Sequence, residues 1–92
     1  MIPPITMYGA TYCEDTARVR EHLQTLGYPF NDVNIDLSKD AEKFVVFVNR
    51  GDRTTPTLVI GEGPLKIVLT EPSNAQVEVV LEKGEIFLGK AA

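Results

Sequence analysis

The sequence predicts an α/β fold with the element order β-α-β-α-β-β-α. Three segments have apolar residues at helical spacing, and each follows a possible N-cap residue and precedes a glycine. Four shorter runs have the length and the β-branched composition of strands. An α/β unit followed by a hairpin would form a four-stranded mixed sheet with helices on both faces.

The first strand is predicted at residues 5–8. Thr11, followed three residues later by Glu14, fits a capping box, which predicts a helix with Cys13 in its first turn. Gly27 is a suitable residue to end this helix.

The middle of the chain predicts a second strand at 30–36, where apolar and polar residues alternate, and then a second helix. Ser38 would cap this helix and Gly51 would end it. The run 44–48 is also suited to a strand, because it is β-branched and aromatic. The cap at Ser38 favours the helix.

Two further strands are predicted at 57–60 and 65–69, joined through the turn-forming residues 61–64 as a hairpin. A second capping-box pattern begins at Ser73 and predicts a third helix, which Gly84 would end.

Composition indicates one small globular domain. The 92 residues are enough for a modest core, and 43% of them are hydrophobic, which is usual for such a chain. We expect a single domain over residues 1–92, with its core in about 5–84 and an unassigned tail at 85–92. The formal charge of −4 and the lack of a basic tract argue against a nucleic-acid partner.

The single cysteine bears on the location of the protein. One cysteine cannot form an internal disulfide or a cysteine-rich zinc site. No segment has the apolar length of a secretory signal or of a membrane-spanning helix. These features predict a cytoplasmic protein without a membrane partner. We also expect a monomer.

Cys13 is the strongest candidate for chemistry. The free backbone N–H groups at a helix N-terminus stabilise a negative charge, and the thiolate that attacks disulfides is such a charge. Glu14 and Asp15 act in the opposite direction, because nearby negative charge raises the pKa of a thiol. We expect a small net lowering of the Cys13 pKa. The alternative is an inert thiol in the core.

Other side chains have plainer interpretations. His22 lies more than two helical turns from Cys13, so we expect no Cys–His dyad. The lone histidine and the scattered carboxylates predict no metal site. The aromatic residues Phe30, Phe44 and Phe47 are expected in the core.

Together these features resemble the glutaredoxin branch of the thioredoxin fold. The resemblance rests on Cys13 at the first helix, on the step Thr54-Thr55-Pro56 before the third strand, and on the helix cap after the hairpin. It covers about residues 5–84. Within it, residues 12–16 and 69–73 are similar to the small actinobacterial-type glutaredoxins called mycoredoxins.

The resemblance implies roles for several residues. Cys13 would be the nucleophile, Pro56 would be a cis proline beside it, and the backbone of Thr55 would pair with the thiol substrate. The N-terminus of the third helix, at Ser73 and Asn74, would hold a carboxylate of a low-molecular-weight thiol.

Three more residues complete the candidate site. Arg53 could meet a ligand carboxylate, or it could simply solvate the loop before the proline. Tyr12 could be a lid over the thiol or a surface aromatic. Thr16 stands where two-cysteine members have their second cysteine, so a two-cysteine mechanism within the chain is impossible, and Thr16 would form a hydrogen bond or fill space.

The resemblance therefore implies a single-cysteine (C-x-x-T) thiol–disulfide oxidoreductase without a bound cofactor. It would reduce mixed disulfides between proteins and a low-molecular-weight thiol, glutathione or mycothiol. The family's Gly-Gly and Asp-rich step for glutathione is replaced by Glu71-Pro72, which leaves the identity of the thiol open. The alternative is a catalytically weak binding or assembly module, because the acidic pair Glu14-Asp15 follows the cysteine. An iron–sulfur cluster carrier is less favoured, because such members have Gly-Phe there and a preceding lysine, whereas this chain has Ala10 before the cysteine.

Overall fold

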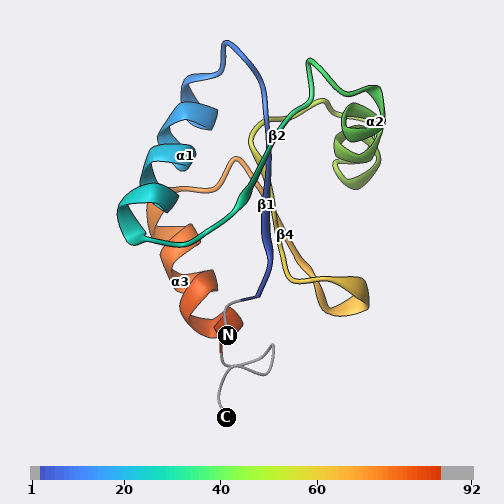
Figure 1. The fold of residues 1–92 in the computed structure, drawn as a ribbon. Coiled ribbons are helices and arrows are strands. Elements are labelled where there is room, and N and C mark those ends of the chain that lie inside the picture. Colours follow the sequence, from blue (N-terminus) through green and yellow to red (C-terminus); the bar gives the residue numbers. More distant parts are fainter. Residues whose placement is uncertain (1–2, 86–92) are drawn as a thin grey trace.

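A four-stranded sheet with the strand order β2-β1-β3-β4 runs through the molecule (Figure 1). The computed structural model describes residues 3–85. Its elements are β1 (Ile5–Gly9), α1 (Glu14–Leu26), β2 (Asn31–Asn34), α2 (Lys39–Val48), β3 (Thr57–Ile60), the 3-10 helix η1 (Gly63–Leu65), β4 (Ile67–Thr70) and α3 (Asn74–Glu85). β1 pairs parallel with β2 and antiparallel with β3, and β3 pairs antiparallel with β4. The predicted mixed sheet is confirmed.

Three loops meet at one end of this sheet. Tyr8, near the end of β1, pairs with Thr57 at the start of β3, and Thr57 also pairs with Thr70 at the end of β4. The segments that follow β1, precede β3 and follow β4 therefore lie at the same end. The first of them carries Cys13 and the second carries Pro56.

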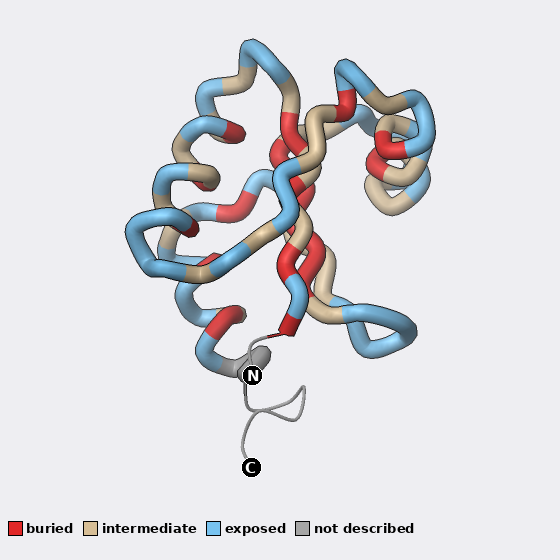
Figure 2. The backbone as a smooth tube through the Cα atoms, viewed as in Figure 1, coloured by how far each residue is buried: buried red, intermediate tan, exposed pale blue. Residues whose placement is uncertain are grey.

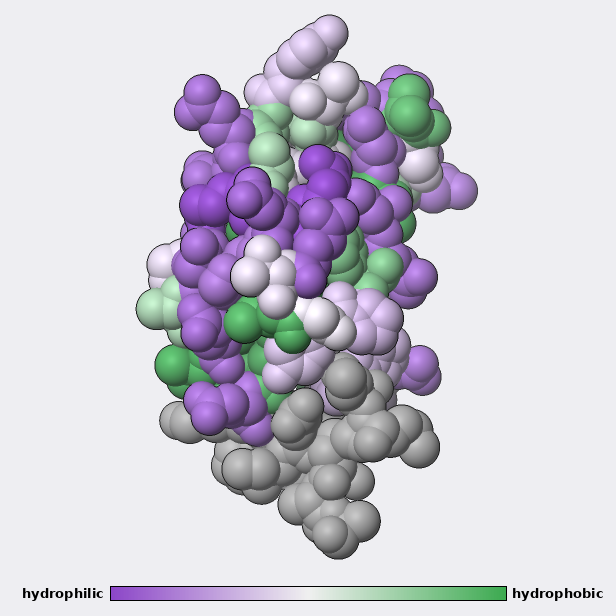
Figure 3. Space-filling view, turned by 60° about the vertical axis from the view of Figure 1, so that its left-hand side comes forward, coloured by the Kyte–Doolittle hydropathy of each residue, from purple (hydrophilic) through white to green (hydrophobic). Residues whose placement is uncertain are grey.

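Helices α1 and α3 cover one face of the sheet (Figures 1 and 2). The buried residues of the core on this face come from β1, α1, β3 and α3: Ile5, Met7, Val19, Leu23, Leu58, Ile60, Val77 and Leu81. Val80 packs against this core, so the inward face predicted for the third helix is confirmed. Seen from this side, the upper part of the molecule is largely hydrophilic, as expected for the outer surface of amphipathic helices (Figure 3).

Helix α2 covers the other face of the sheet with a smaller core (Figure 1). Ala41 and Val45 are buried there with Ile35, which follows β2. Phe44 packs against them, and its ring centroid lies 4.9 Å from that of Tyr8 on β1. Since fully burying one apolar side chain contributes about 1.5–3 kcal/mol, this face holds α2 less strongly than the opposite face holds α1 and α3.

The aromatic residues divide between core and surface. Phe30 packs against the core under α1 and α3, and Phe44 packs against the core under α2, as expected. Phe47 is 81% exposed, so its predicted place in the core is wrong. It follows the buried Val45 by two residues, which is about 200° around the helix axis, so it points away from the sheet.

Two of the three predicted helix caps are confirmed. Ser38 Oγ accepts a hydrogen bond from the Ala41 N–H group at the start of α2. Ser73 Oγ accepts from the N–H group of Gln76, and Gln76 Oε1 accepts from the N–H group of Ser73, which is a complete capping box at α3.

The predicted cap of the first helix is wrong. Cys13 itself is the N-cap of α1, with an extended backbone at φ −121°. Thr11 lies in the preceding turn, where its N–H group donates to Asp36 and its hydroxyl accepts from Asn34. Both partners belong to the end of β2 and the turn after it, so local sequence spacing could not reveal them.

Two strand boundaries also differ from the prediction. β2 is shorter than the predicted strand 30–36, because Asp36 lies in a turn in which the Leu37 N–H group donates to the Asn34 carbonyl. Leu65 belongs to η1 instead of β4 and is exposed. Pro64 favours this outcome, because its ring fixes φ near the helical value.

Helix α3 continues past its predicted end. Gly84 lies within the helix, which the structure describes to Glu85. The rest of the predicted tail, 86–92, lies outside the described residues.

Candidate active site

The site begins where β1 ends and α1 begins. Gly9 is buried at the end of β1, and a Cβ atom there would lie 2.3 Å from Cγ2 of Thr16. Thr16 is itself 1% exposed, and its hydroxyl accepts a hydrogen bond from the Ala10 N–H group at 3.3 Å. The absence of a side chain at Gly9 thus lets Thr16 fasten the first turn of α1 to the end of the strand. Both predicted uses of Thr16, filling space and forming a hydrogen bond, describe its contacts.

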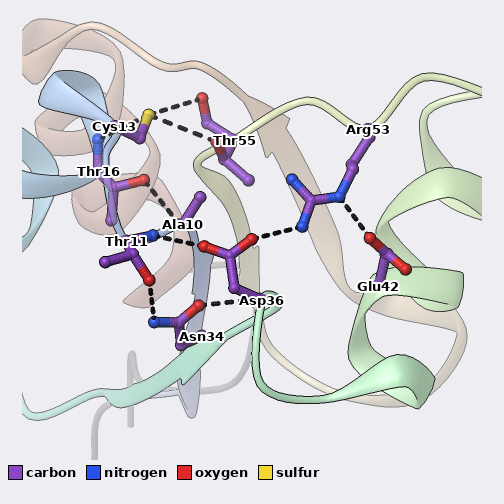
Figure 4. Close-up of polar contacts among 9 residues, drawn as sticks. All are labelled: Ala10, Thr11, Cys13, Thr16, Asn34, Asp36, Glu42, Arg53 and Thr55. Carbon is purple, nitrogen blue, oxygen red and sulfur yellow. Dashed lines mark hydrogen bonds and ion pairs between the residues drawn. The ribbon is translucent and has the colours of Figure 1, made fainter.

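The sulfur of Cys13 lies between this turn and the loop before β3 (Figure 4). Sγ accepts a hydrogen bond from the Thr16 N–H group at 3.4 Å. It lies 3.4 Å from Oγ1 and 3.6 Å from the carbonyl oxygen of Thr55. The Thr55 hydroxyl can donate to a thiolate, and the thiol can donate to the carbonyl oxygen. Cys13 is partly exposed.

These contacts change the pKa of the thiol. Burial raises the pKa of Cys13, but hydrogen bonds from the side chains of Thr16 and Thr55 and from the N–H groups of Thr16 and Asp15 together outweigh burial and hold it below its ordinary value. The direction agrees with the lowering expected from the sequence. A larger fraction of Cys13 is therefore thiolate at neutral pH than for a free cysteine.

The loop that faces the sulfur is held in place by hydrogen bonds from neighbouring segments. The Thr55–Pro56 peptide bond is cis, as the resemblance implied, and Pro56 is buried. The carbonyl of Pro56 accepts a hydrogen bond from the Glu71 N–H group at 2.9 Å. The hydroxyl of Thr57 donates to the carbonyl of Thr54 and accepts from Nδ2 of Asn49, at 2.9 Å each. Helix α2, β3 and the loop after β4 therefore all support the Thr55–Pro56 step.

Arg53 does not point freely into solvent. Its Nη2 atom lies 2.6 Å from Oδ1 of Asp36, and its Nε atom donates to Oε2 of Glu42 on α2 (Figure 4). Oδ2 of Asp36 accepts from the Thr11 N–H group at 2.8 Å. Because Thr11 and Arg53 donate to it, the pKa of Asp36 falls to about 2. A ligand carboxylate at Arg53 would have to compete with these two side chains.

Ser73 and Asn74 lie at the N-terminus of α3, as predicted, and both side chains have partners. Ser73 caps the helix. Oδ1 of Asn74 accepts from Nη1 of Arg18 at 2.7 Å, and Nη2 of the same arginine donates to the Pro72 carbonyl at 2.9 Å. Sequence reasoning missed Arg18. Its spacing from Asp15 indicates only a local ion pair on α1 and gives no sign of partners more than 50 residues away.

Two predicted residues lie apart from the sulfur contacts. Tyr12 is in the turn before Cys13 and is 100% exposed, so its ring is open to solvent, and its role as a lid stays a prediction. His22 lies 3.1 Å from the carboxylate of Glu78 and joins α1 to α3. This position agrees with the expectation that it forms no dyad with Cys13.

Within residues 3–85, no group of three or more histidine, cysteine or acidic side chains is arranged to hold a metal ion. In the same part of the chain, no helix is long and apolar enough to cross a membrane.

Solved structures with the same architecture define the class of fold. Thioredoxin O2 from Arabidopsis thaliana in its oxidized state superposes with a TM-score of 0.69 and 17% identity, over 89% of this chain and 74% of that chain. The holo form of glutaredoxin C1 from Populus tremula x tremuloides gives 0.60 and 23% identity, over 98% and 87%. At such identities the likeness concerns the fold, and the fold is that of thioredoxin.

Sequence comparison then identifies the family within this fold. The family model described as Glutaredoxin matches residues 5–63. Two Mycobacterium tuberculosis proteins that are provisionally named glutaredoxins, one from each of two strains, are 32% identical over 79 residues, which is 86% of this chain and 90% of each relative. The chain belongs to the glutaredoxin family. It is therefore a protein of the thiol–disulfide oxidoreductase class, whose members act with thiol co-substrates and mixed-disulfide protein partners.

Proposed function

We propose that this protein is a single-cysteine glutaredoxin that reduces mixed disulfides between proteins and a low-molecular-weight thiol. The observation that carries the proposal is the position of Cys13 Sγ. Cys13 is the N-cap of α1, its Sγ atom lies 3.4 Å from the hydroxyl oxygen of Thr55, and the residue is partly exposed. A thiolate stabilised by donors and open to a disulfide is what nucleophilic exchange requires.

The chemistry needs one cysteine and two small thiols. In the first step the Cys13 thiolate attacks the small-thiol sulfur of the mixed disulfide, a bond forms between these two sulfurs, and the protein sulfur leaves as a thiolate that takes a proton from solvent. In the second step another small-thiol molecule attacks as its thiolate and forms the oxidised small-thiol disulfide. Cys13 leaves as the thiolate. Overall, the mixed disulfide and one free small thiol give the reduced protein thiol and the oxidised small-thiol disulfide, so the free thiol is oxidised as the protein sulfur is reduced.

The surrounding residues would bind the small thiol. In this proposal the backbone of Thr55 and the ring of Pro56 align the disulfide next to Cys13, while Ser73 and Asn74 place the N-terminus of α3 toward an anionic group of the ligand. Tyr12 covers the bound thiol from the solvent side, and Thr16 supports the first turn of α1.

The co-substrate in this proposal is glutathione or mycothiol. These two thiols differ in how they would interact with Arg53. Glutathione carries carboxylates that would compete with Asp36 and Glu42 for the guanidinium, whereas a thiol without a carboxylate would leave both ion pairs in place. The proposal also includes a cytoplasmic monomer, which rests on the composition of the sequence.

The direct test is reduction of a protein–small-thiol mixed disulfide by wild type and by Cys13→Ser. Glutathione, mycothiol and no thiol are compared as reductants in one turnover assay. We expect the variant to lose the activity, because serine is not a nucleophile toward disulfides at neutral pH. Equal turnover by the folded variant, checked by circular dichroism, would end the proposal.

Titration of the thiolate by ultraviolet absorbance separates this proposal from a binding or assembly module. The acidic residues Glu14 and Asp15 beside the cysteine favour that alternative. The hydrogen bonds to Cys13 predict a pKa below that of a free cysteine. A measured pKa at or above the free-thiol value would favour the module.

A further inference from the structure

Asp36 lies in the turn that follows β2, two residues after the strand ends, and its carboxylate has two partners from different loops. Oδ2 accepts from the backbone N–H group of Thr11 at 2.8 Å, and Oδ1 lies 2.6 Å from Nη2 of Arg53 (Figure 4). From the sequence alone, Asp36 is interpreted as an ordinary acidic residue after a strand.

Each of the two partners lies two residues before a residue of the sulfur site. Thr11 precedes Cys13 by two residues, and Arg53 precedes Thr55 by two residues. Cys13 and Thr55 then meet at 3.4 Å. One carboxylate therefore joins the two loops whose next residues form the sulfur site.

We propose that Asp36 is a positioning residue, which holds the Cys13 turn against the Thr55–Pro56 loop through Thr11 and Arg53. This inference rests on the proposed function, because it concerns the reactivity of the same thiol. Asp36 does not touch the sulfur in this arrangement. It sets the distance over which the Thr55 hydroxyl can donate to the thiolate.

Further contacts fix Asp36 and its partners in place. Nδ2 of Asn34 donates to the Thr11 hydroxyl at 3.0 Å, and Oδ1 of Asn34 accepts from the Asp36 N–H group at 2.9 Å. On the other side, Glu42 of α2 binds Nε of Arg53. The carboxylate is thus the shared member of a chain of contacts that runs from the turn before α1 to helix α2.

The sign of the effect separates positioning from simple electrostatics. A negative charge near a thiol raises the pKa of that thiol, so removal of the Asp36 charge alone would lower the pKa of Cys13. Loss of the alignment with Thr55 removes a hydrogen bond to the thiolate and would raise the pKa. The two explanations predict opposite shifts.

The experiment measures the pH dependence of iodoacetamide alkylation, which reports Cys13 alone because the chain has one cysteine. The variants are Asp36→Ala, which loses both contacts, and Asp36→Asn. The asparagine oxygen can still accept from Thr11, but its amide nitrogen cannot accept from Arg53.

Asp32 supplies a matched control. It also lies at the exposed side of β2 and pairs with an arginine, since Nε of Arg20 lies 2.6 Å from its Oδ2. The side chains of the Arg20–Asp32 pair are 38% and 40% exposed, and those of the Arg53–Asp36 pair are 41% and 36% exposed. Asp32→Asn and Asp32→Ala therefore remove a similar ion pair, between β2 and α1, that does not join the Cys13 turn to the Thr55–Pro56 loop.

We expect Asp36→Ala to raise the pKa of Cys13 and to slow alkylation at neutral pH about fivefold, the effect of one lost hydrogen bond. Asp36→Asn should have a smaller effect in the same direction, and the Asp32 variants should behave as wild type. An unchanged or lowered pKa in Asp36→Asn would overturn the inference. So would an equal rise in Asp32→Asn, because the effect would then be a general loss of charge or stability.

This readout does not depend on catalysis. If wild type fails to reduce mixed disulfides while the Asp36 variants still shift the pKa of Cys13, the proposed function fails and the positioning role stands. If wild type is active and Asp36→Asn matches it in both alkylation and turnover, only the positioning role fails. Asp36→Asn keeps the test available should Asp36→Ala not fold.

Discussion

The two faces of the sheet are held by different kinds of interaction. The face under α1 and α3 has a continuous apolar core drawn from two strands and two helices. The face under α2 has the short core of Ile35, Ala41 and Val45, and polar contacts supplement it. Among these contacts, Asn49 joins α2 to Thr57 and Thr70.

Because of this difference, one half of the site is anchored to the larger core and the other half to the smaller core. Cys13 belongs to α1, on the face with the larger core. The Thr55–Pro56 loop follows α2 and depends on the face with the smaller core. The sulfur site is therefore sensitive to contacts between the halves, among them the contact of Cys13 with Thr55 and the contacts of Asp36 with Thr11 and Arg53.

The largest effect should come from filling the tight space at the end of β1. Gly9→Ala would place a Cβ atom 2.3 Å from Thr16 Cγ2, and overpacking of this kind costs roughly 2 to 3 kcal/mol. Urea unfolding measures the cost. Gly51→Ala is the comparison on the α2 side, where a Cβ atom meets nothing within 4 Å and only the backbone at φ +105° opposes the substitution. A larger loss of stability at Gly51 than at Gly9 would show that steric overlap with Thr16 is not the dominant cost.

A matched pair of core truncations should have the next largest effect. Val19 on α1 and Val45 on α2 are each 0% exposed. We expect Val19→Ala to cost about 2 kcal/mol, through lost apolar burial and the cavity left behind. Val45→Ala should cost about 1 kcal/mol, because the smaller core can collapse around the gap. Denaturant midpoints at constant m-value report both numbers, and equal losses would show that the two faces contribute alike.

The smallest effect should appear as a dependence of stability on pH. The pKa of Asp36 falls from 3.8 to about 2 because Thr11 and Arg53 bind its charged form. A carboxylate whose pKa is lower in the folded than in the unfolded protein stabilises the fold at pH values above the pKa of the unfolded state. This contribution disappears as the pH falls through the pKa of the folded state. Stability should therefore decrease between about pH 4 and pH 2 less steeply in Asp36→Asn than in wild type. Parallel urea midpoints for the two proteins over that range would argue against the bridge.

Local signals in the sequence predicted the fold well. The caps at Ser38 and Ser73 depend on residues three positions away, and both are confirmed. The cap at Ser38 and the terminating Gly51 favour a helix over a strand for residues 44–48, and the structure has helix α2 there. Phe47 was misplaced because apolar character alone does not say which side of a helix a residue occupies.

The site was predictable only in part. The place of Cys13 at the start of the first helix follows from residue type and spacing, although it is the N-cap and not a residue of the first turn. The cis proline was implied only by the resemblance to glutaredoxins, and the structure has it at Thr55–Pro56. The Thr11 cap was wrong because Asp36, 25 residues later, and Asn34, 23 residues later, bind that threonine instead. Arg18 was missed for the same reason. Partners of this kind are brought together by the sheet, so only the tertiary structure reveals them.

The sulfur of Cys13 serves as the end group of α1 as well as the proposed nucleophile. A thiolate interacts more strongly with the amino end of a helix than a neutral disulfide sulfur does. If Cys13 cycles between these two forms, the helix is better anchored in the resting enzyme than in the covalent intermediate. The helix N-terminus would then favour release of the small thiol from Cys13. The mixed disulfide with Cys13 would be a short-lived intermediate and not a stable end product.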